Sequence, residues 1–191
     1  MASKRKSKGN GRRTSRPTGR TNDGQRHDAI ALLKADHRQV EGWFEQFKKS
    51  RVPRKKAELA ESICRALRIH TQIEEEIFYP AFLEAAGDEE IHHEAEVEHA
   101  GAKNLILEIE QAGSDDEYLD ARVNVLAEMI RHHVKEEEKR DGMFAKARQA
   151  DMPLEEIGER LEERKAELQG TMGDRTSQQQ TVRDSKQAGM R

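Results

Sequence analysis

Residues 70–80 read HTQIEEEIFYP and place His70 and Glu74 four residues apart, which is about one turn of a helix. Both belong to a stripe that is otherwise apolar and recurs every three or four residues, the spacing of one helix face. The stripe comprises Leu59, Ile63, Ala66, His70, Glu74, Ile77 and Ala81. It predicts a helix over residues 53–87. Because Pro80 lacks a backbone N–H, we expect a local bend there.

Three further stretches show the same spacing, over residues 28–49, over residues 88–112 and after the acidic run at residues 115–117. A shorter stretch with a thinner apolar edge covers residues 154–168, and we expect it to pack across one end of the others. Each long stripe again contains polar exceptions, which are His37, His99, His133 and Glu137.

These patterns predict an all-α protein, an up-down antiparallel four-helix bundle with a short fifth helix and disordered termini. The connections are short, so successive long helices should be antiparallel neighbours. Of the 191 residues only 34% are hydrophobic, which favours one small domain. We assign residues 1–24 to a basic disordered tail, residues 25–169 to the bundle and residues 170–191 to a disordered polar tail.

The charge is unevenly distributed. Residues 1–20 hold eight basic side chains and no acidic one, so residues 21–191 carry a net charge of about −11 against −3 for the whole chain. We interpret residues 1–20 as a solubilising tail. The alternative is weak contact with nucleic acid or an anionic surface through charge alone.

Cysteine content and hydropathy bear on the compartment. Cys64 is the only cysteine, so no internal disulfide can form and a reducing compartment is favoured. The sequence contains no apolar run long enough for a membrane span, and the basic N-terminus lacks the apolar segment of a secretory signal. We therefore expect a soluble, cytoplasmic protein.

The polar residues on the four stripes carry the functional prediction. Burying carboxylates in an apolar core costs several kcal/mol unless something neutralises them, and a bound cation would do so. We predict that this cation is held by His37, His70, Glu74, His99, His133 and Glu137. Four imidazoles and two carboxylates suffice for two metal ions bridged by two glutamates, with coordination positions left open. Without thiolates the set suits iron, manganese or zinc, and we favour two irons.

Two adjacent histidines, His132 and His133, leave two possible choices for the ligand on the last long helix. His132 and Glu136 also lie four residues apart, but at 3.6 residues per turn His132 points about 100° away from the stripe that holds His133. We expect His92 to lie at the bundle end or beside the ligands, and His93 to be exposed.

The ordered motifs resemble those of a known family. HTQIEEEIFYP at residues 70–80 and HVKEEE at residues 133–138, with DH at 36–37 and EVEHA at 96–100, are similar to the hemerythrin-like, or HHE cation-binding, family. The resemblance implies a non-haem di-iron centre in a four-helix bundle. It also implies that the four histidines are terminal ligands and that the two glutamates bridge the irons.

The sequence departs from the dioxygen-carrying members of that family, which have two histidines one turn apart on the third helix. Here the positions on either side of His99 are Ala95 and Lys103. Those members also place an aspartate five residues after the last histidine, where this chain has Glu138. The sequence therefore does not predict reversible oxygen carriage.

Three functions fit these residues. The first is a di-iron protein that senses, binds or reacts with O2, peroxide or NO, or handles iron, in stress response. The second is a di-iron enzyme of peroxide decomposition, NO reduction or iron-cluster repair, supplied with electrons by a partner. The third is a helical bundle with a purely structural metal, which would have a closed site.

Overall fold

The computed structural model describes residues 28–112 and 116–188, with side chains described up to Thr171. Every regular element in these ranges is helical, which confirms the all-α prediction. The elements are α1 (Ala29–Lys49), α2 (Pro53–Ile73), the π-helix η1 (Glu74–Phe78), α3 (Tyr79–Ala86), α4 (Glu89–Ala112), α5 (Leu119–Glu138), α6 (Met143–Gln149) and α7 (Leu154–Ala188).

The predicted helix boundaries have local physical causes. Asp28 caps α1, since its carboxylate accepts a hydrogen bond of 2.7 Å from the backbone N–H of Ala31. Pro53 occupies the first turn of α2, where its missing N–H costs nothing. Gly87 ends α3 with a φ of 65°, a left-handed conformation that glycine adopts without strain. Residues 113–115, which include the first residue of the acidic run before the fourth predicted helix, lie outside the described residues.

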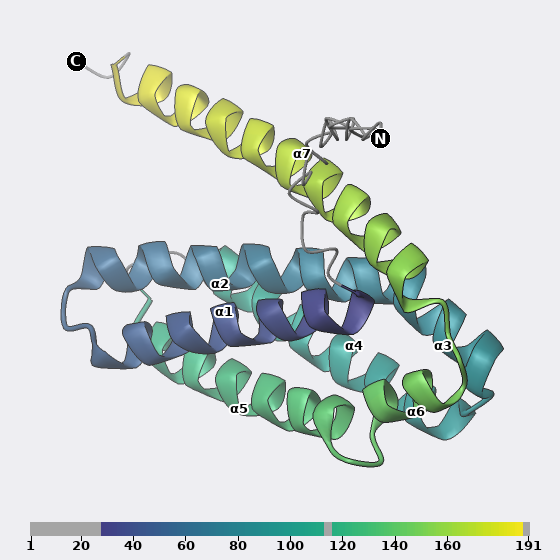
Figure 1. Ribbon diagram of the computed structural model, residues 1–191. Helices are drawn as coiled ribbons and strands as arrows, with labels where there is room; N and C mark the ends of the chain where they lie inside the picture. Colours follow the sequence, from purple (N-terminus) through teal and green to yellow (C-terminus); the bar gives the residue numbers. More distant parts are fainter. Residues whose placement is uncertain (1–27, 113–115, 189–191) are drawn as a thin grey trace, which may run out of the picture.

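Four long helical segments form the bundle (Figure 1). α2, η1 and α3 follow one another without a break and together make the second segment. Each segment packs against two neighbours, so that α1, α2, α4 and α5 form a closed ring around a shared interior. None of the described helices is long and apolar enough to cross a membrane.

The two C-terminal helices differ from expectation. The sequence analysis missed α6, which packs against α3 and α5 and covers one end of the bundle. α7 does not pack across an end, because its contacts are with α1, α2 and η1 on a side of the bundle (Figure 1). The helix is described as far as Ala188, and the assignment of residues 170–191 to a polar tail stays a prediction.

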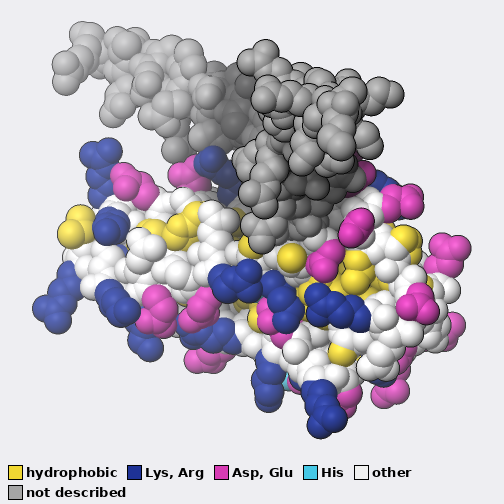
Figure 2. Space-filling model, in the orientation of Figure 1, with side chains coloured by type: hydrophobic (Ala, Val, Ile, Leu, Met, Phe, Trp, Pro, Cys, Tyr) yellow, Lys and Arg dark blue, Asp and Glu magenta, His cyan; other side chains and the backbone are white. Residues whose placement is uncertain are grey.

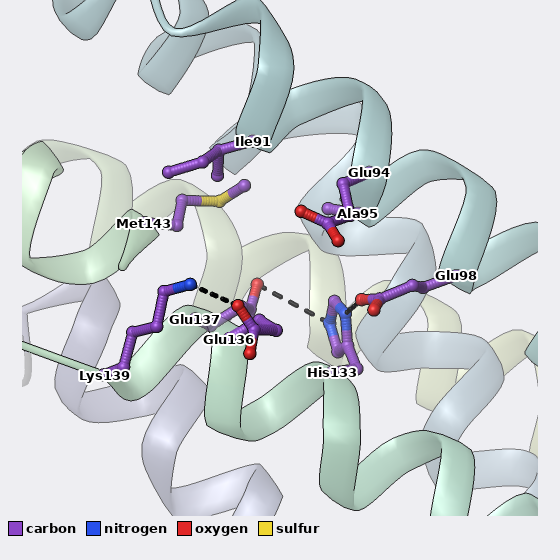
Figure 3. Close-up of a pocket in the computed structure, with 9 residues that line it drawn as sticks. All are labelled: Ile91, Glu94, Ala95, Glu98, His133, Glu136, Glu137, Lys139 and Met143. Carbon is purple, nitrogen blue, oxygen red and sulfur yellow. Dashed lines mark hydrogen bonds and ion pairs between the residues drawn. The ribbon is translucent and has the colours of Figure 1, made fainter. Parts of the chain in front are cut away.

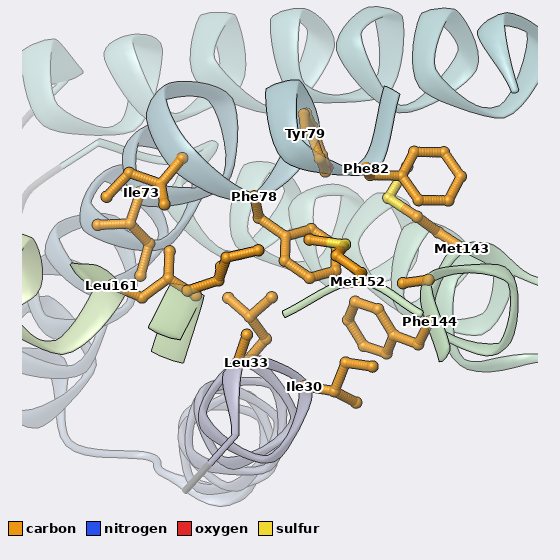
Figure 4. Packing of buried hydrophobic residues seen from close by; sticks show 14 of the residues in the cluster. Ile30, Leu33, Ile73, Phe78, Tyr79, Phe82, Met143, Phe144, Met152 and Leu161 are labelled. Atoms are coloured by element: carbon orange, nitrogen blue, oxygen red, sulfur yellow. The ribbon is translucent and has the colours of Figure 1, made fainter. Parts of the chain in front are cut away.

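The apolar interior is divided into two clusters by the polar side chains. One cluster lies toward α3, α6 and α7 and includes Leu33 and Phe78 (Figure 4). The other lies toward the opposite end of the bundle and includes Val40 and Ile106. On α1, His37 falls between Leu33 of the first cluster and Val40 of the second. The polar layer is therefore enclosed by hydrophobic packing on both sides.

The outer surface shown in Figure 2 carries many charged side chains, in contrast to the apolar interior. Lys, Arg, Asp and Glu side chains are interspersed there, and hardly any histidine surface is visible on this face. The basic segment at residues 1–20 lies outside the described residues, so its proposed contacts remain a prediction.

Candidate metal centre

All six predicted ligands meet in the buried layer. His37 comes from α1, His70 from α2, Glu74 from η1 and His99 from α4, while His133 and Glu137 come from α5; every one of them is buried. The six therefore come from all four segments of the bundle, as the stripe pattern predicted.

The imidazoles point their Nε2 atoms toward one another in two groups. In the first, the Nε2 atoms of His37 and His70 lie 3.1 Å apart, and Glu74 Oε2 lies 3.2 Å from His70 Nε2. In the second, the Nε2 atoms of His99 and His133 lie 3.2 Å apart, and the same Glu74 oxygen lies 3.4 Å from His99 Nε2. Each group can offer a cation three donor atoms within 4.8 Å of one another, and Glu74 belongs to both.

Glu137 links the two groups from the other side. Its Oε2 lies 3.4 Å from His37 Nε2, and its Oε1 lies 3.6 Å from His133 Nε2. It therefore lies close to one histidine of each group.

Burial makes this layer unfavourable without a counter-ion. Desolvation raises the pKa of Glu74 to about 7 and that of Glu137 to about 8, the mutual repulsion of the two carboxylates adding to the shift of Glu137. Desolvation also lowers the pKa of His37 far below its ordinary value, which keeps its imidazole neutral and able to bind a metal. Both oxygens of Glu74 and Oε2 of Glu137 lack a hydrogen-bond partner. These buried oxygen atoms are therefore free to coordinate bound cations.

A second layer of carboxylates surrounds the histidines, and the sequence analysis missed it. Glu138 Oε1 lies 2.8 Å from His37 Nδ1, Glu75 Oε1 lies 3.0 Å from His99 Nδ1, and Glu98 Oε2 lies 2.8 Å from His133 Nδ1. Asp36 faces His70 Nδ1 at the longer distance of 3.6 Å. A carboxylate that accepts the Nδ1–H fixes the imidazole with its Nε2 lone pair free for a metal.

These carboxylates form a closed ring around the bundle. The α1 carboxylate faces the α2 histidine, the η1 carboxylate faces the α4 histidine, the α4 carboxylate faces the α5 histidine, and the α5 carboxylate faces the α1 histidine. Each is also the sequence neighbour of one of the six predicted ligands. The sequence pairs DH, EE, EH and EE therefore contain these carboxylates, but only the packing shows that each one faces a histidine of the neighbouring helical segment.

Tyr79 also reaches the centre, a role that the sequence analysis did not assign. Its hydroxyl lies 3.1 Å from His99 Nε2 and 3.4 Å from Glu137 Oε1. In a regular α-helix a residue five positions after Glu74 would point about 140° away from it. The π-helical turn η1 brings Tyr79 onto the face of Glu74, since the Tyr79 N–H bonds to the Glu74 carbonyl. This wide turn comes directly before Pro80 and is the form that the expected irregularity takes.

The remaining histidines lie apart from the Nε2 atoms. His92 is half-buried and its ring packs against Tyr79 at a centroid distance of 5.9 Å. His93 is exposed, as expected. His27 lies outside the described residues.

Comparison with known proteins agrees with this geometry. A model of the hemerythrin HHE cation-binding domain matches residues 28–146, which is more than half of the chain. The chain belongs to the hemerythrin HHE cation-binding domain family. Its fold is similar to the crystal structure of an HHE cation-binding domain-containing protein from Mycobacterium kansasii, with a TM-score of 0.63 and 23% identity over 75% of this chain and 88% of that one. Comparison with curated proteins gave no significant match.

The register of the HHE domain on α5 can be tested directly. The His133 side chain is 4% exposed and points inward, whereas His132 is 59% exposed and pairs with Glu98 at 3.1 Å. We expect His133→Ala to lower the metal content of the purified protein and His132→Ala, the matched control on the same turn, to leave it intact. Elemental analysis of both variants measures this, and the opposite result would mean that the register is shifted by one residue.

Proposed function

We propose that this HHE protein holds two non-haem irons and that it senses, binds or reacts with O2, peroxide or NO, or handles iron, in stress response. The donor set supports iron, because imidazole and carboxylate without thiolate suit it, as they do manganese and zinc. His37, His70, His99 and His133 would be terminal ligands, and Glu74 and Glu137 would bridge the ions. Such an iron pair would supply redox chemistry and open coordination positions for a small ligand.

The observation that carries this proposal is the pair of buried histidine and glutamate groups, beside which lies a cavity of about 10 Å³. On one side it is lined by all four of these histidines, and on the other by the apolar side chains Val40, Leu67, Ile130 and Val134. Its volume is close to the minimum that one water molecule needs, so only a very small ligand could approach the centre on this side.

The oxygen carriers have a second histidine one turn from the counterpart of His99, and this chain has no histidine at either of those positions. Ala95 is small and buried, and Lys103 donates hydrogen bonds of 2.8 Å to both oxygens of Glu75. Because this imidazole is missing, we do not propose reversible oxygen carriage. Steady turnover of peroxide or NO by the iron-loaded protein would favour the enzyme alternative.

Metal analysis combined with ligand binding tests the proposal. We expect about two irons per chain and absorption bands in the near-ultraviolet and visible regions that change when azide, peroxide or NO is added. Two irons whose spectrum does not respond to any of the three would favour a structural metal. A folded chain that cannot be loaded with Fe(II) would exclude the proposal altogether.

A variant of the cavity wall sharpens the test. Val134 is half-buried at the cavity, so Val134→Phe should fill the space while keeping the metal ligands. We expect azide and NO affinity to fall by about tenfold or more with iron content unchanged. The matched control is Val125→Phe, at an exposed position on the same helix. Equal affinity in both variants would show that ligands reach the centre elsewhere.

A further inference from the structure

A second cavity touches the centre from a different side, between α4, α5 and the start of α6 (Figure 3). It has a volume of about 20 Å³, enough for one water molecule or one bare cation. Three glutamates line it, Glu94 and Glu98 from α4 and Glu136 from α5, and its wall also includes His133 and Glu137 of the centre. This cavity therefore connects an acidic surface to two of the predicted ligands.

The carboxylates become more buried toward the centre. Glu94 is exposed, the Glu136 and Glu98 side chains are 26% and 19% exposed, and Glu137 is only 2% exposed. Glu137 also carries the buried Oε2 that has no hydrogen-bond partner. A cation that enters between the outer glutamates would therefore meet successive carboxylates and end at an unsatisfied one.

The other sides of the centre attract a cation less strongly. Three of the four carboxylates that face the histidines are each paired with a lysine, Asp36 with Lys165, Glu75 with Lys103 and Glu138 with Lys34. The fourth, Glu98, is paired with His132 instead, and Glu98 is the one that lines this cavity. The cavity beside Val40 and Leu67 is largely apolar and would not attract a hydrated ion.

Lys139 stands at the same cavity and forms an ion pair with Glu136 (Figure 3). Its ammonium group neutralises one of the three outer carboxylates. The side chain is 39% exposed, so it can swing into solvent when a divalent cation takes its place.

We propose that this acidic cavity is the entry route by which Fe2+ reaches the centre, with Glu94, Glu98 and Glu136 attracting the ion and Lys139 opposing it. The inference rests on the proposed function, because it requires a centre that binds iron. It adds a kinetic role for residues that ligate no metal in the final state. Fixed charges at a narrow opening change the rate of association of a charged ligand far more than the final occupancy.

Opposite charge changes should therefore alter loading in opposite directions. In anaerobic stopped-flow mixing of Fe2+ with the metal-free full chain at low salt, we expect Glu94→Gln to slow loading about three- to tenfold and Lys139→Gln to accelerate it by a similar factor. Both effects should shrink at high salt, because the Debye length falls to about 3 Å at 1 M. The final iron content should equal that of the unmodified chain in both variants.

The matched control is Glu128→Gln, an exposed position on α5 that does not line the cavity and makes the same change in net charge. If Glu94→Gln and Glu128→Gln slow loading equally, or if Lys139→Gln does not accelerate it, the entry route is wrong. Failure of the proposed function is distinguishable, because the unmodified chain would then take up no iron at all.

Discussion

Replacing Glu74 by alanine is expected to lower the metal content of the chain more than any other single substitution at the centre. Glu74 is the one side chain that belongs to both groups of donors, so its loss removes a ligand from each. It is fully buried, and the atoms that lie 3.2 Å and 3.4 Å from its Oε2 are the Nε2 atoms of His70 and His99, which are themselves predicted ligands. We expect fewer than one iron per chain by elemental analysis, against about two for the unmodified protein.

The companion variants separate loss of a bridge from loss of fold. Glu137→Ala should retain more metal, because each group keeps three donors without it, and the double Glu74→Ala and Glu137→Ala protein should not bind a second metal.

Glu76→Ala is the matched control, since Glu76 is exposed on the same turn and pairs with Arg164 instead. If the alanine variant does not fold, Glu74→Gln keeps the volume and removes the charge. Two irons per chain in Glu74→Gln and Glu74→Ala would show that Glu74 bridges nothing.

The sequence predicted the six inward-facing residues because each replaces an apolar residue on a helix stripe. His37 sits between Leu33 and Val40 at regular helical spacing, and the structure places it between the two clusters to which they belong. Such substitutions are visible without tertiary information, since period and polarity alone define them. The same reasoning separated His133 from His132, which differ by one position and by a large fraction of exposure.

The surrounding carboxylates could not be predicted in this way. Glu75 and Glu98 lie off the apolar stripes, Glu75 within an acidic run and Glu98 between Val97 and His99, and each resembles an ordinary residue of a solvated face. Their roles depend on how neighbouring helices are rotated, because each accepts from a histidine on the next segment. That rotation is a property of packing and leaves no periodic signal in either helix alone.

Tyr79 escaped prediction for a different reason. Uniform α-helical spacing places Ala81 on the stripe, whereas the π-helical turn shifts the register and buries Tyr79 and Phe82 in its place. A single extra residue in one turn redirects every later side chain of the helix. Pro80 marked the position of the irregularity without specifying its type, and the consequence for the centre followed only from the structure.

The pH dependence of stability tests the electrostatics of the centre. The metal-free chain is expected to lose stability as the pH rises from about 6.5 to about 8. Burial raises the pKa values of Glu74 and Glu137 to about 7 and about 8, against an ordinary value of 4.5 for a glutamate side chain. Acids with raised pKa values in the folded state bind more protons there than in the unfolded chain, so their contribution is present below the unfolded pKa and is lost as the pH rises through the folded pKa.

Between about pH 6.5 and about pH 8 the titration of His37 does not affect the stability. Its pKa is lowered by burial, so its contribution is lost only as the pH falls below the ordinary histidine value of about 6.5. Above that pH the two carboxylates dominate, and the loss should be on the order of 2 kcal/mol. For a chain of this size that corresponds to a decrease of roughly 4–8 °C in the unfolding temperature.

Metal should cancel this dependence, because a bound cation keeps both carboxylates ionised in the folded state across the window. The difference in unfolding temperature between the loaded and metal-free protein should therefore widen from pH 6.5 to pH 8, as measured by differential scanning calorimetry. The matched control is the metal-free double variant Glu74→Gln and Glu137→Gln, whose amides do not titrate and whose unfolding temperature should stay nearly level. An unmodified metal-free chain that is equally stable at both ends of the window would mean that the buried carboxylates are already neutralised by the protein, and that a cation is not what the polar layer requires.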